Sequence, residues 1–224
     1  MDERIQVLNV QLNNMTAKEA MKKVVTYIET EPLNVIEMIT MQALTKFREE
    51  EQVNELFESF DIVLASDKEI LQVAGVEDER RLKEVEELLF IKMVMRYLRK
   101  NSIRVFLLAE TEADLQKLEM YMQEDYANMQ VVEVATIENQ GASDDMLLNL
   151  INGSESVCIL SALPSPMEER FISKNRTLVN GRLWLGLGNL LDEMKKEKNG
   201  FDKIKRFIMR ILLKKEMTKK GENA

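Results

Sequence analysis

Short apolar runs alternate along the chain with stretches in which apolar residues recur every three or four positions. The apolar runs are typical of buried strands, and the recurrence every three or four positions is typical of amphipathic helices. The predicted strands cover residues 5–12, 35–41, 61–65, 103–108, 131–137, 157–161 and 183–187. The predicted helices that follow them cover 16–28, 44–59, 66–75, 78–99, 111–126, 143–152 and a segment starting at Ser165. This alternation predicts an α/β fold with a doubly wound, mostly parallel sheet of the Rossmann-like type, covered by helices on both faces.

Capping signals support the predicted helix starts. The expected N-caps are Thr16, Ser66, Thr111, Ser143 and Ser165. Thr16 and Ser66 are each followed three residues later by a glutamate, which is the spacing of a capping box. Pro166 falls in the first turn of the last helix, a position that favours proline. Glu168 and Glu169 lie in the same turn, where the helix dipole alone accounts for acidic side chains.

Composition narrows the chemistry available to this chain of 224 residues. It contains no histidine, which excludes Ser-His and Cys-His nucleophilic sites, and a single cysteine, which excludes a zinc site. Catalysis would rest on carboxylates, hydroxyls, amines or backbone dipoles, and no metal or cofactor is expected. Cys158 lies in an apolar run, so we expect a buried, unreactive thiol in a reducing compartment. The acidic N-terminus and the lack of an apolar run of about 20 residues favour a cytoplasmic protein.

The last thirty residues differ from the rest. From residue 193 to 224 there are eleven Lys/Arg and five Asp/Glu, a net charge of +6 against −14 for the preceding residues. Its apolar positions are Phe201, Ile204, Phe207, Ile208, Ile211 and Leu212, at helical spacing. We therefore expect an α/β domain over 1–193 and a basic amphipathic helical appendage over 194–224. Such a helix either contacts an anionic membrane or ligand or packs on the domain through its apolar face.

Ligands of parallel sheets bind beyond the carboxyl ends of the strands, which directs attention to residues 39–46, 65–69, 109–112, 137–143, 161–169 and 186–192. Asp67 follows the predicted strand 61–65, where a carboxylate can act as a general base, although residues there more often cap the next helix. The segment from Gly186 to Asn189 follows the last strand, where backbone amides can meet a diphosphate. A closely packed strand end is the more common explanation for such glycines.

The order of several short segments resembles a known family. They are Val7–Val10, Asn14–Ala20, Asp61–Leu64, Arg104–Leu108, Pro166 with Glu169, Phe171-Ile172, Asn175-Arg176 and Gly186–Gly188 with Asp192. Spread in order over nearly the whole chain, they resemble the WecG/TagA/CpsF glycosyltransferases. The resemblance implies transfer of an N-acetylhexosamine from a UDP-sugar to a polyprenyl-diphosphate-linked acceptor in the synthesis of cell-envelope polysaccharide. It also implies that the appendage reaches the acceptor at the inner face of the membrane, and that the chain can self-associate. No nucleic-acid partner is expected.

The resemblance also assigns roles to individual residues. The implied site consists of Asp67 as the base, Thr40 at the sugar or acceptor, Gly186, Gly188, Asn189 and Glu169 at the donor, and Arg206 and Arg210 near the acceptor diphosphate.

Several family motifs are altered in this chain. In an ungapped comparison the family's catalytic aspartate falls on Ser66, so that Asp67 is one place late, and Lys68 replaces a glycine. A Gly-Gly pair reads Ala109-Glu110, and a Pro-Lys-Gln-Glu motif reads Pro166-Met167-Glu168-Glu169. Acidic side chains near a diphosphate would repel it unless cations intervene. A non-catalytic member acting as a binding or regulatory partner is therefore the first alternative, and an unrelated nucleotide-binding α/β enzyme is the second.

Overall fold

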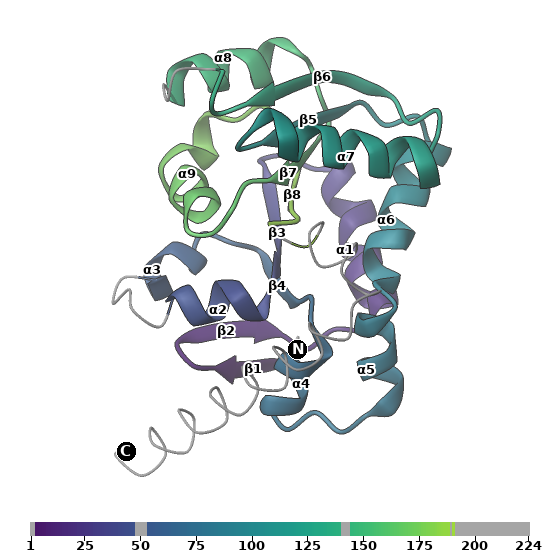
Figure 1. The fold of residues 1–224 in the computed structure, drawn as a ribbon, viewed down its shortest axis with the longest axis vertical. Helices are drawn as coiled ribbons and strands as arrows, with labels where there is room; N and C mark the ends of the chain where they lie inside the picture. Colours follow the sequence, from purple (N-terminus) through teal and green to yellow (C-terminus); the bar gives the residue numbers. More distant parts are fainter. Residues whose placement is uncertain (1–2, 48–52, 140–143, 189, 191–224) are drawn as a thin grey trace.

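A computed structural model describes residues 3–47, 53–139, 144–188 and 190, and its centre is a parallel sheet (Figure 1). The strands are β1 (Arg4–Val7), β2 (Val10–Asn13), β3 (Asn34–Ile39), β4 (Ile62–Ala65), β5 (Val105–Ala109), β6 (Val131–Thr136), β7 (Cys158–Ala162) and β8 (Leu183–Gly186). Six of them form one all-parallel sheet in the order β4-β3-β8-β7-β5-β6. The strand predictions from residue 35 onward are confirmed, with ends that differ by at most two residues.

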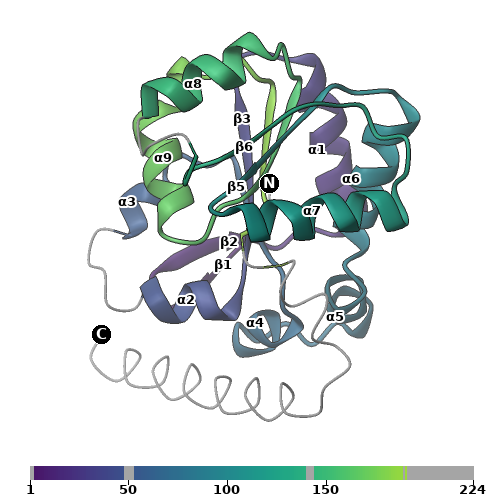
Figure 2. The same ribbon diagram turned by 45° about the horizontal axis from the view of Figure 1, so that its top comes forward.

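Helices cover both faces of this sheet, as Figures 1 and 2 show. They are α1 (Ala17–Glu29), α2 (Met41–Phe47), α3 (Val53–Phe57), α4 (Lys68–Val73), α5 (Glu79–Glu86), α6 (Leu89–Lys100), α7 (Glu112–Asp125), α8 (Asp144–Gly153) and α9 (Met167–Asn175), with a 3₁₀ turn η1 (Arg176–Leu178). Buried side chains of α1, α6 and α7 form one core with one face, and those of α2, α4, α8 and α9 form a second core with the other. The doubly wound α/β fold is confirmed.

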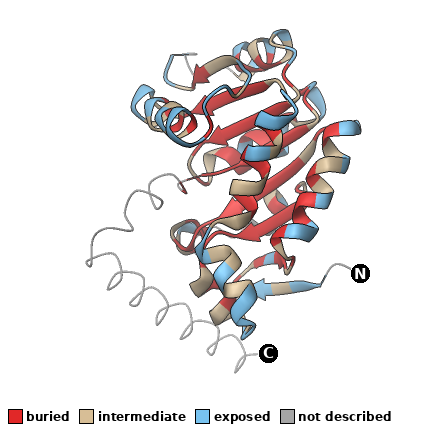
Figure 3. Cartoon of the chain, turned by 90° about the vertical axis from the view of Figure 1, so that its right-hand side faces the viewer, coloured by how far each residue is buried: buried red, intermediate tan, exposed pale blue. Residues whose placement is uncertain are grey.

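Continuous apolar runs form the central strands because both faces are covered. Every residue of β5, β7 and β8 is buried. Figure 3 shows the same contrast, with red strands inside and pale blue surface on the outer sides of the helices. Cys158 is among these fully buried residues, as expected from its apolar run.

The prediction of one strand over 5–12 is wrong, because this run forms an antiparallel hairpin outside the six-stranded sheet. Val7 pairs with Val10, and Leu8 between them has a φ of 55°, so the chain reverses within two residues. The hairpin is joined to the edge of the large sheet by Asn13, whose Oδ1 accepts a 2.9 Å hydrogen bond from the backbone N–H of Val63.

The predicted helix 78–99 is in fact two helices, α5 and α6. Leu88, between them, has a φ of 51°, which the right-handed helix does not allow. The predicted helix 44–59 is likewise divided into α2, which begins at Met41, and the short α3, with residues 48–52 outside the described part. At Leu88 a local change of backbone conformation thus separates two helices that share one apolar period.

Two of the predicted caps are confirmed. Thr16 and Glu19 form a reciprocal capping box at the start of α1, with Glu19 N donating to Thr16 Oγ1 at 3.2 Å and Thr16 N to Glu19 Oε2 at 2.8 Å. Thr111 Oγ1 accepts a 3.2 Å hydrogen bond from the N–H of Asp114 at the start of α7. The expected cap at Ser143 lies outside the described residues.

Two other caps are wrong. Ser66 Oγ donates to Ile39 O at 2.9 Å instead of capping α4, whose N-cap position is Asp67. Ser165 Oγ donates to Glu169 Oε1 at 2.7 Å, while Pro166 occupies the N-cap position of α9. In both cases the serine is buried and its hydroxyl donates to an acceptor in the interior. The N-cap pattern in the sequence does not reveal this burial.

The predicted appendage, 194–224, lies outside the described residues, as do Asn189, Arg206 and Arg210. Among the helices that are described, none combines the length and the apolar character needed to cross a membrane.

Candidate active site

Thr40 and Asp67 lie together where β3 and β4 end. Asp67 Oδ2 accepts a 2.7 Å hydrogen bond from the backbone N–H of Met41, and Thr40 Oγ1 accepts a 3.1 Å bond from the N–H of Ala43. Both side chains therefore bind the first turn of α2, and both are buried, at 2% and 6% exposure. The parallel pairing of β3 and β4 produces this proximity, because it aligns the loops that follow the two strands.

A small cavity of about 30 Å³ lies beside the same strand ends. Met38, Leu64 and Ala65, near the ends of β3 and β4, line it together with Ala17 and Ala20 of α1. Arg81 and Glu84 of α5 line it from the other side. The cavity is much smaller than the 300–1,000 Å³ of typical ligand sites, so it does not hold a nucleotide-sized ligand in this conformation.

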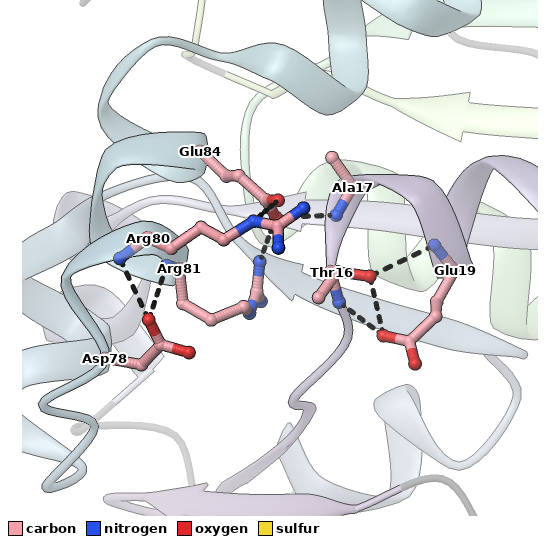
Figure 4. Close-up of polar contacts among 7 residues, drawn as sticks. All are labelled: Thr16, Ala17, Glu19, Asp78, Arg80, Arg81 and Glu84. Atoms are coloured by element: carbon pink, nitrogen blue, oxygen red, sulfur yellow. Dashed lines mark hydrogen bonds and ion pairs between the residues drawn. The ribbon is translucent and has the colours of Figure 1, made fainter.

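Figure 4 shows how α5 is held against α1. Glu84 Oε2 accepts a 2.9 Å hydrogen bond from the backbone N–H of Ala17 and a 3.0 Å bond from Nη1 of Arg81. The side chains of Arg81 and Glu84 are 11% and 10% exposed, whereas that of the neighbouring Arg80 is 84% exposed. The buried Nε of Arg81 has no hydrogen-bond partner among the described residues.

The Arg81–Glu84 pair was missed by sequence reasoning because α5 resembles a solvated helix. Its composition is strongly polar, and none of its residues is as fully enclosed as those of the core. The spacing of three between Arg81 and Glu84 places both side chains on one face, which is the only signal that the sequence contains. Their burial depends on the approach of α1, which a local pattern does not show.

Three carboxyl side chains form a buried cluster under the end of β8. Glu37 of β3 is 1% exposed, and Glu168 and Glu169 of α9 are fully buried. Trp184 Nε1 donates a 2.6 Å hydrogen bond to Glu168 Oε1. The helix dipole explains the position of the two α9 glutamates in the first turn, but it does not explain their burial. The sequence interpretation that the dipole alone accounts for them is therefore insufficient.

Burial controls the charge of this cluster. Desolvation, followed by repulsion from Glu168 and Glu169, raises the pKa of Glu37 well above its ordinary value. Desolvation also raises the pKa of Glu168 to about 8, although the hydrogen bond from Trp184 lowers this pKa. Burial therefore favours the protonated form of both groups, which reduces the repulsion of a diphosphate that an ionised Glu168 would cause. In the described ranges these residues do not have the arrangement of a metal site.

Gly186 is required by the carboxyl cluster. A Cβ at this position would collide with Oε2 of Glu37 and would lie 2.8 Å from Oε1 of Glu168. This confirms the interpretation of a closely packed strand end. Gly188 has a φ of 48°, the left-handed region that favours glycine, and a Cβ there would make only ordinary contacts, 3.9 Å from the backbone oxygen of Leu163 and 4.0 Å from Oε1 of Glu37. The turn after β8 thus combines one glycine needed for packing with one needed for backbone conformation.

Comparison with known proteins places this architecture in a family. A family model described as Glycosyl transferase WecG/TagA/CpsF family matches residues 5–199, which include both cores and every strand of the large sheet. No curated protein matches the chain. Since the family model covers most of the chain, this protein belongs to the WecG/TagA/CpsF family of glycosyl transferases.

Proposed function

We propose that this protein transfers an N-acetylhexosamine from a UDP-sugar to a polyprenyl-diphosphate-linked acceptor. The observation that carries the proposal is the meeting of Thr40 and Asp67 at the carboxyl ends of β3 and β4, next to strand residues that share a cavity lining with Arg81. A hydroxyl, a carboxylate and a guanidinium at one end of a parallel sheet supply a sugar contact, a base and a phosphate partner.

Asp67 is the proposed base. The bond from Met41 uses Oδ2 and fixes the orientation of the carboxylate, which leaves Oδ1 as the oxygen that would take the proton of the acceptor hydroxyl. Thr40, anchored to the same turn, would contact the sugar or the acceptor. The backbone of Gly186–Gly188 would approach the nucleotide, and Glu169 would position this turn from beneath.

Arg81 is the proposed partner of the UDP diphosphate. Its guanidinium lines the cavity and is bound to Glu84, an internal carboxylate that lies at the N-terminus of α1. A diphosphate would replace Glu84 at this position, because arginine and a helix N-terminus both bind anions. This exchange would move α5 outward and enlarge the cavity, with the break at Leu88 as the hinge.

The second candidate is a non-catalytic member that binds a partner in the same pathway. Two observations favour it: Asp67 is engaged by Met41, and the closed α5 leaves a cavity of only about 30 Å³. In that case the cavity would stay closed in the presence of UDP-sugars. Arg206 and Arg210 would then serve a peripheral association with anionic membrane rather than the acceptor diphosphate.

A transfer assay separates the two candidates. The full-length protein is incubated with UDP-N-acetylglucosamine or UDP-N-acetylmannosamine and a short-chain polyprenyl-diphosphate saccharide, and both UDP release and lengthening of the acceptor are measured. Acceptor-dependent release of UDP with matching product is the expected result. Donor and acceptor that remain unchanged, although a relative with intact motifs turns them over in the same assay, would contradict the proposed activity.

A further inference from the structure

A second cavity, of about 350 Å³, lies between the β1–β2 hairpin and the segment that leads from α3 into β4. Its volume is within the range of small-molecule binding sites. Asp61, which lines it, directly precedes β4, whereas Asp67 follows β4. The cavity is therefore at the opposite end of this strand from the candidate active site.

The hairpin contributes one wholly polar wall. In its antiparallel register Gln6 pairs with Gln11 and Arg4 with Asn13, so these four side chains share one face. The alternate positions are apolar and pack into the core. The cavity is lined by the polar face together with Asn9 of the turn. Four of these five side chains are amides, which are neutral and carry both donors and acceptors.

The amides keep hydrogen-bonding capacity for a ligand. Asn13 is 8% exposed and uses Oδ1 for the N–H of Val63, while its Nδ2 has no hydrogen-bond partner within the described residues. Gln11 accepts from Arg4 through Oε1 at 3.3 Å, and Gln6 donates through Nε2 to Leu8 O at 3.3 Å. Gln11 and Asn13 thus keep amide donors and Gln6 keeps an acceptor, and the strand register places all three side chains on one face of the hairpin.

The opposite wall combines aromatic carbon with balanced charge. Phe57 and Phe60 pack edge to face, with ring centroids 5.3 Å apart, and both line the cavity. Asp61 is neutralised by Arg176 at 2.8 Å and also accepts from the N–H of Val35 at 2.7 Å. Glu58 is the other acidic lining residue, and Arg4 lies on the facing wall. This balance does not favour a phosphate or another anion.

We propose that this cavity binds a neutral saccharide unit. A sugar ring presents many hydroxyl groups, each a donor and an acceptor, together with an apolar face of C–H groups, and the amide wall and the phenylalanine edges match these features. The site would hold glycan away from the reacting end of the sheet. The inference does not depend on sugar transfer, because it rests on residues that lie apart from Asp67 and Arg81.

The test is a titration of the ¹⁵N-labelled full-length protein with N-acetylglucosamine and with N,N′-diacetylchitobiose, followed in amide spectra. We expect shifts in the side-chain amides of Gln6, Gln11 and Asn13 and in the backbone of residues 57–63, saturating at about 1 mM for this open site. The double variant Gln6→Ala, Gln11→Ala should bind at least tenfold more weakly. Both glutamines are exposed, so folding should persist, and Gln116→Ala on α7 is the matched control.

Two further measurements keep this inference separate from the proposed function. Asp67→Asn should bind the saccharide like the parent, and saturating UDP should not displace it. Absence of shifts in the hairpin amides would overturn the proposal. Shifts that UDP abolishes, or binding that the double glutamine variant retains in full, would also overturn it, because either result places the sugar elsewhere.

Discussion

The carboxylate of Asp67 accepts a hydrogen bond from the backbone N–H of Met41 at 2.7 Å, which ties the loop after β4 to the start of α2. This contact gives the proposed base a fixed orientation. It also gives Asp67 a structural role, so a test of its chemistry has to preserve the bond. An asparagine at this position can still accept from Met41 through its side-chain oxygen, but it cannot take a proton.

Asp67→Asn should therefore lower the turnover of sugar transfer by about 10²–10⁴-fold, the usual contribution of a general base. The thermal unfolding temperature should stay close to that of the parent, because the bond to Met41 remains. Asp125→Asn, at an exposed position on α7, is the control for loss of one negative charge. Equal turnover by Asp67→Asn and the parent would remove Asp67 as the base.

Arg81→Met should weaken the binding of UDP by about tenfold or more, which corresponds to about 1.4 kcal/mol. The reason is the loss of a bidentate partner for the diphosphate. Arg80→Met is a matched control. It removes the same charge at the neighbouring position, where the side chain of Arg80 is 84% exposed. Calorimetry measures both affinities, and equal weakening in the two variants would indicate a general effect of charge instead of a contact by Arg81.

The buried carboxyl cluster predicts a pH dependence of stability. The pKa of Glu168 is raised from 4.5 to about 8 in the folded protein, so the folded state binds more protons than the unfolded state between these values. Stability should be highest below pH 4.5, as far as this group is concerned, and should fall as the pH rises toward and through about 8.

Thermal unfolding of the parent and of Glu168→Gln across this range tests the prediction. The variant keeps an oxygen for the indole N–H of Trp184 and has no proton to lose, so its unfolding temperature should decline less on the alkaline side. Glu86→Gln, a change at a more exposed carboxylate on α5, serves as the comparison. Parallel curves for the parent and Glu168→Gln would show that this glutamate does not titrate as described.

Gly186→Ala should destabilise the fold by about 1–3 kcal/mol, the usual cost of overpacking a core. The added Cβ would collide with Glu37. Gly186→Ala should therefore cost less stability when it is introduced into the Glu37→Ala variant than when it is introduced into the parent. Gly153→Ala is the control, because no atom lies within 4 Å of its added Cβ. Denaturant unfolding gives the free energy of unfolding of the parent and of the four variants. An unchanged free energy of unfolding in Gly186→Ala would contradict the packing explanation.

Much of this fold could be predicted from the sequence because its strands are buried on both faces. The run that became β5 is apolar throughout, the run that became β7 has Ser161 as its single polar residue, and Thr16 with Glu19 marks the start of α1 through contacts within one turn. Such features depend on neighbours in the chain. The family resemblance implied one site for Thr40 and Asp67, and the parallel pairing of β3 and β4 brings the two side chains to the same edge of the sheet.

The remaining features depend on contacts between distant segments. Leu88 lies within a continuous apolar period, so its left-handed backbone, which separates α5 from α6, has no local signal. The turn at Leu8 lacks glycine, and the hairpin therefore resembled one strand. Glu168 has the sequence pattern of an exposed first-turn acid, and only Trp184 and Gly186, far along the chain, account for its burial.

The central claim is that the site at the ends of β3 and β4 still binds a UDP-sugar, and calorimetric titration of the full-length protein tests it most directly. UDP-N-acetylglucosamine, UDP-N-acetylmannosamine and UDP are titrated separately. We expect binding of at least one of the sugars in the micromolar range, about −8 kcal/mol, weakened in Arg81→Met and unchanged in Arg80→Met. A well-folded sample that releases no heat with any of the three would contradict the claim and would favour the non-catalytic member of the family.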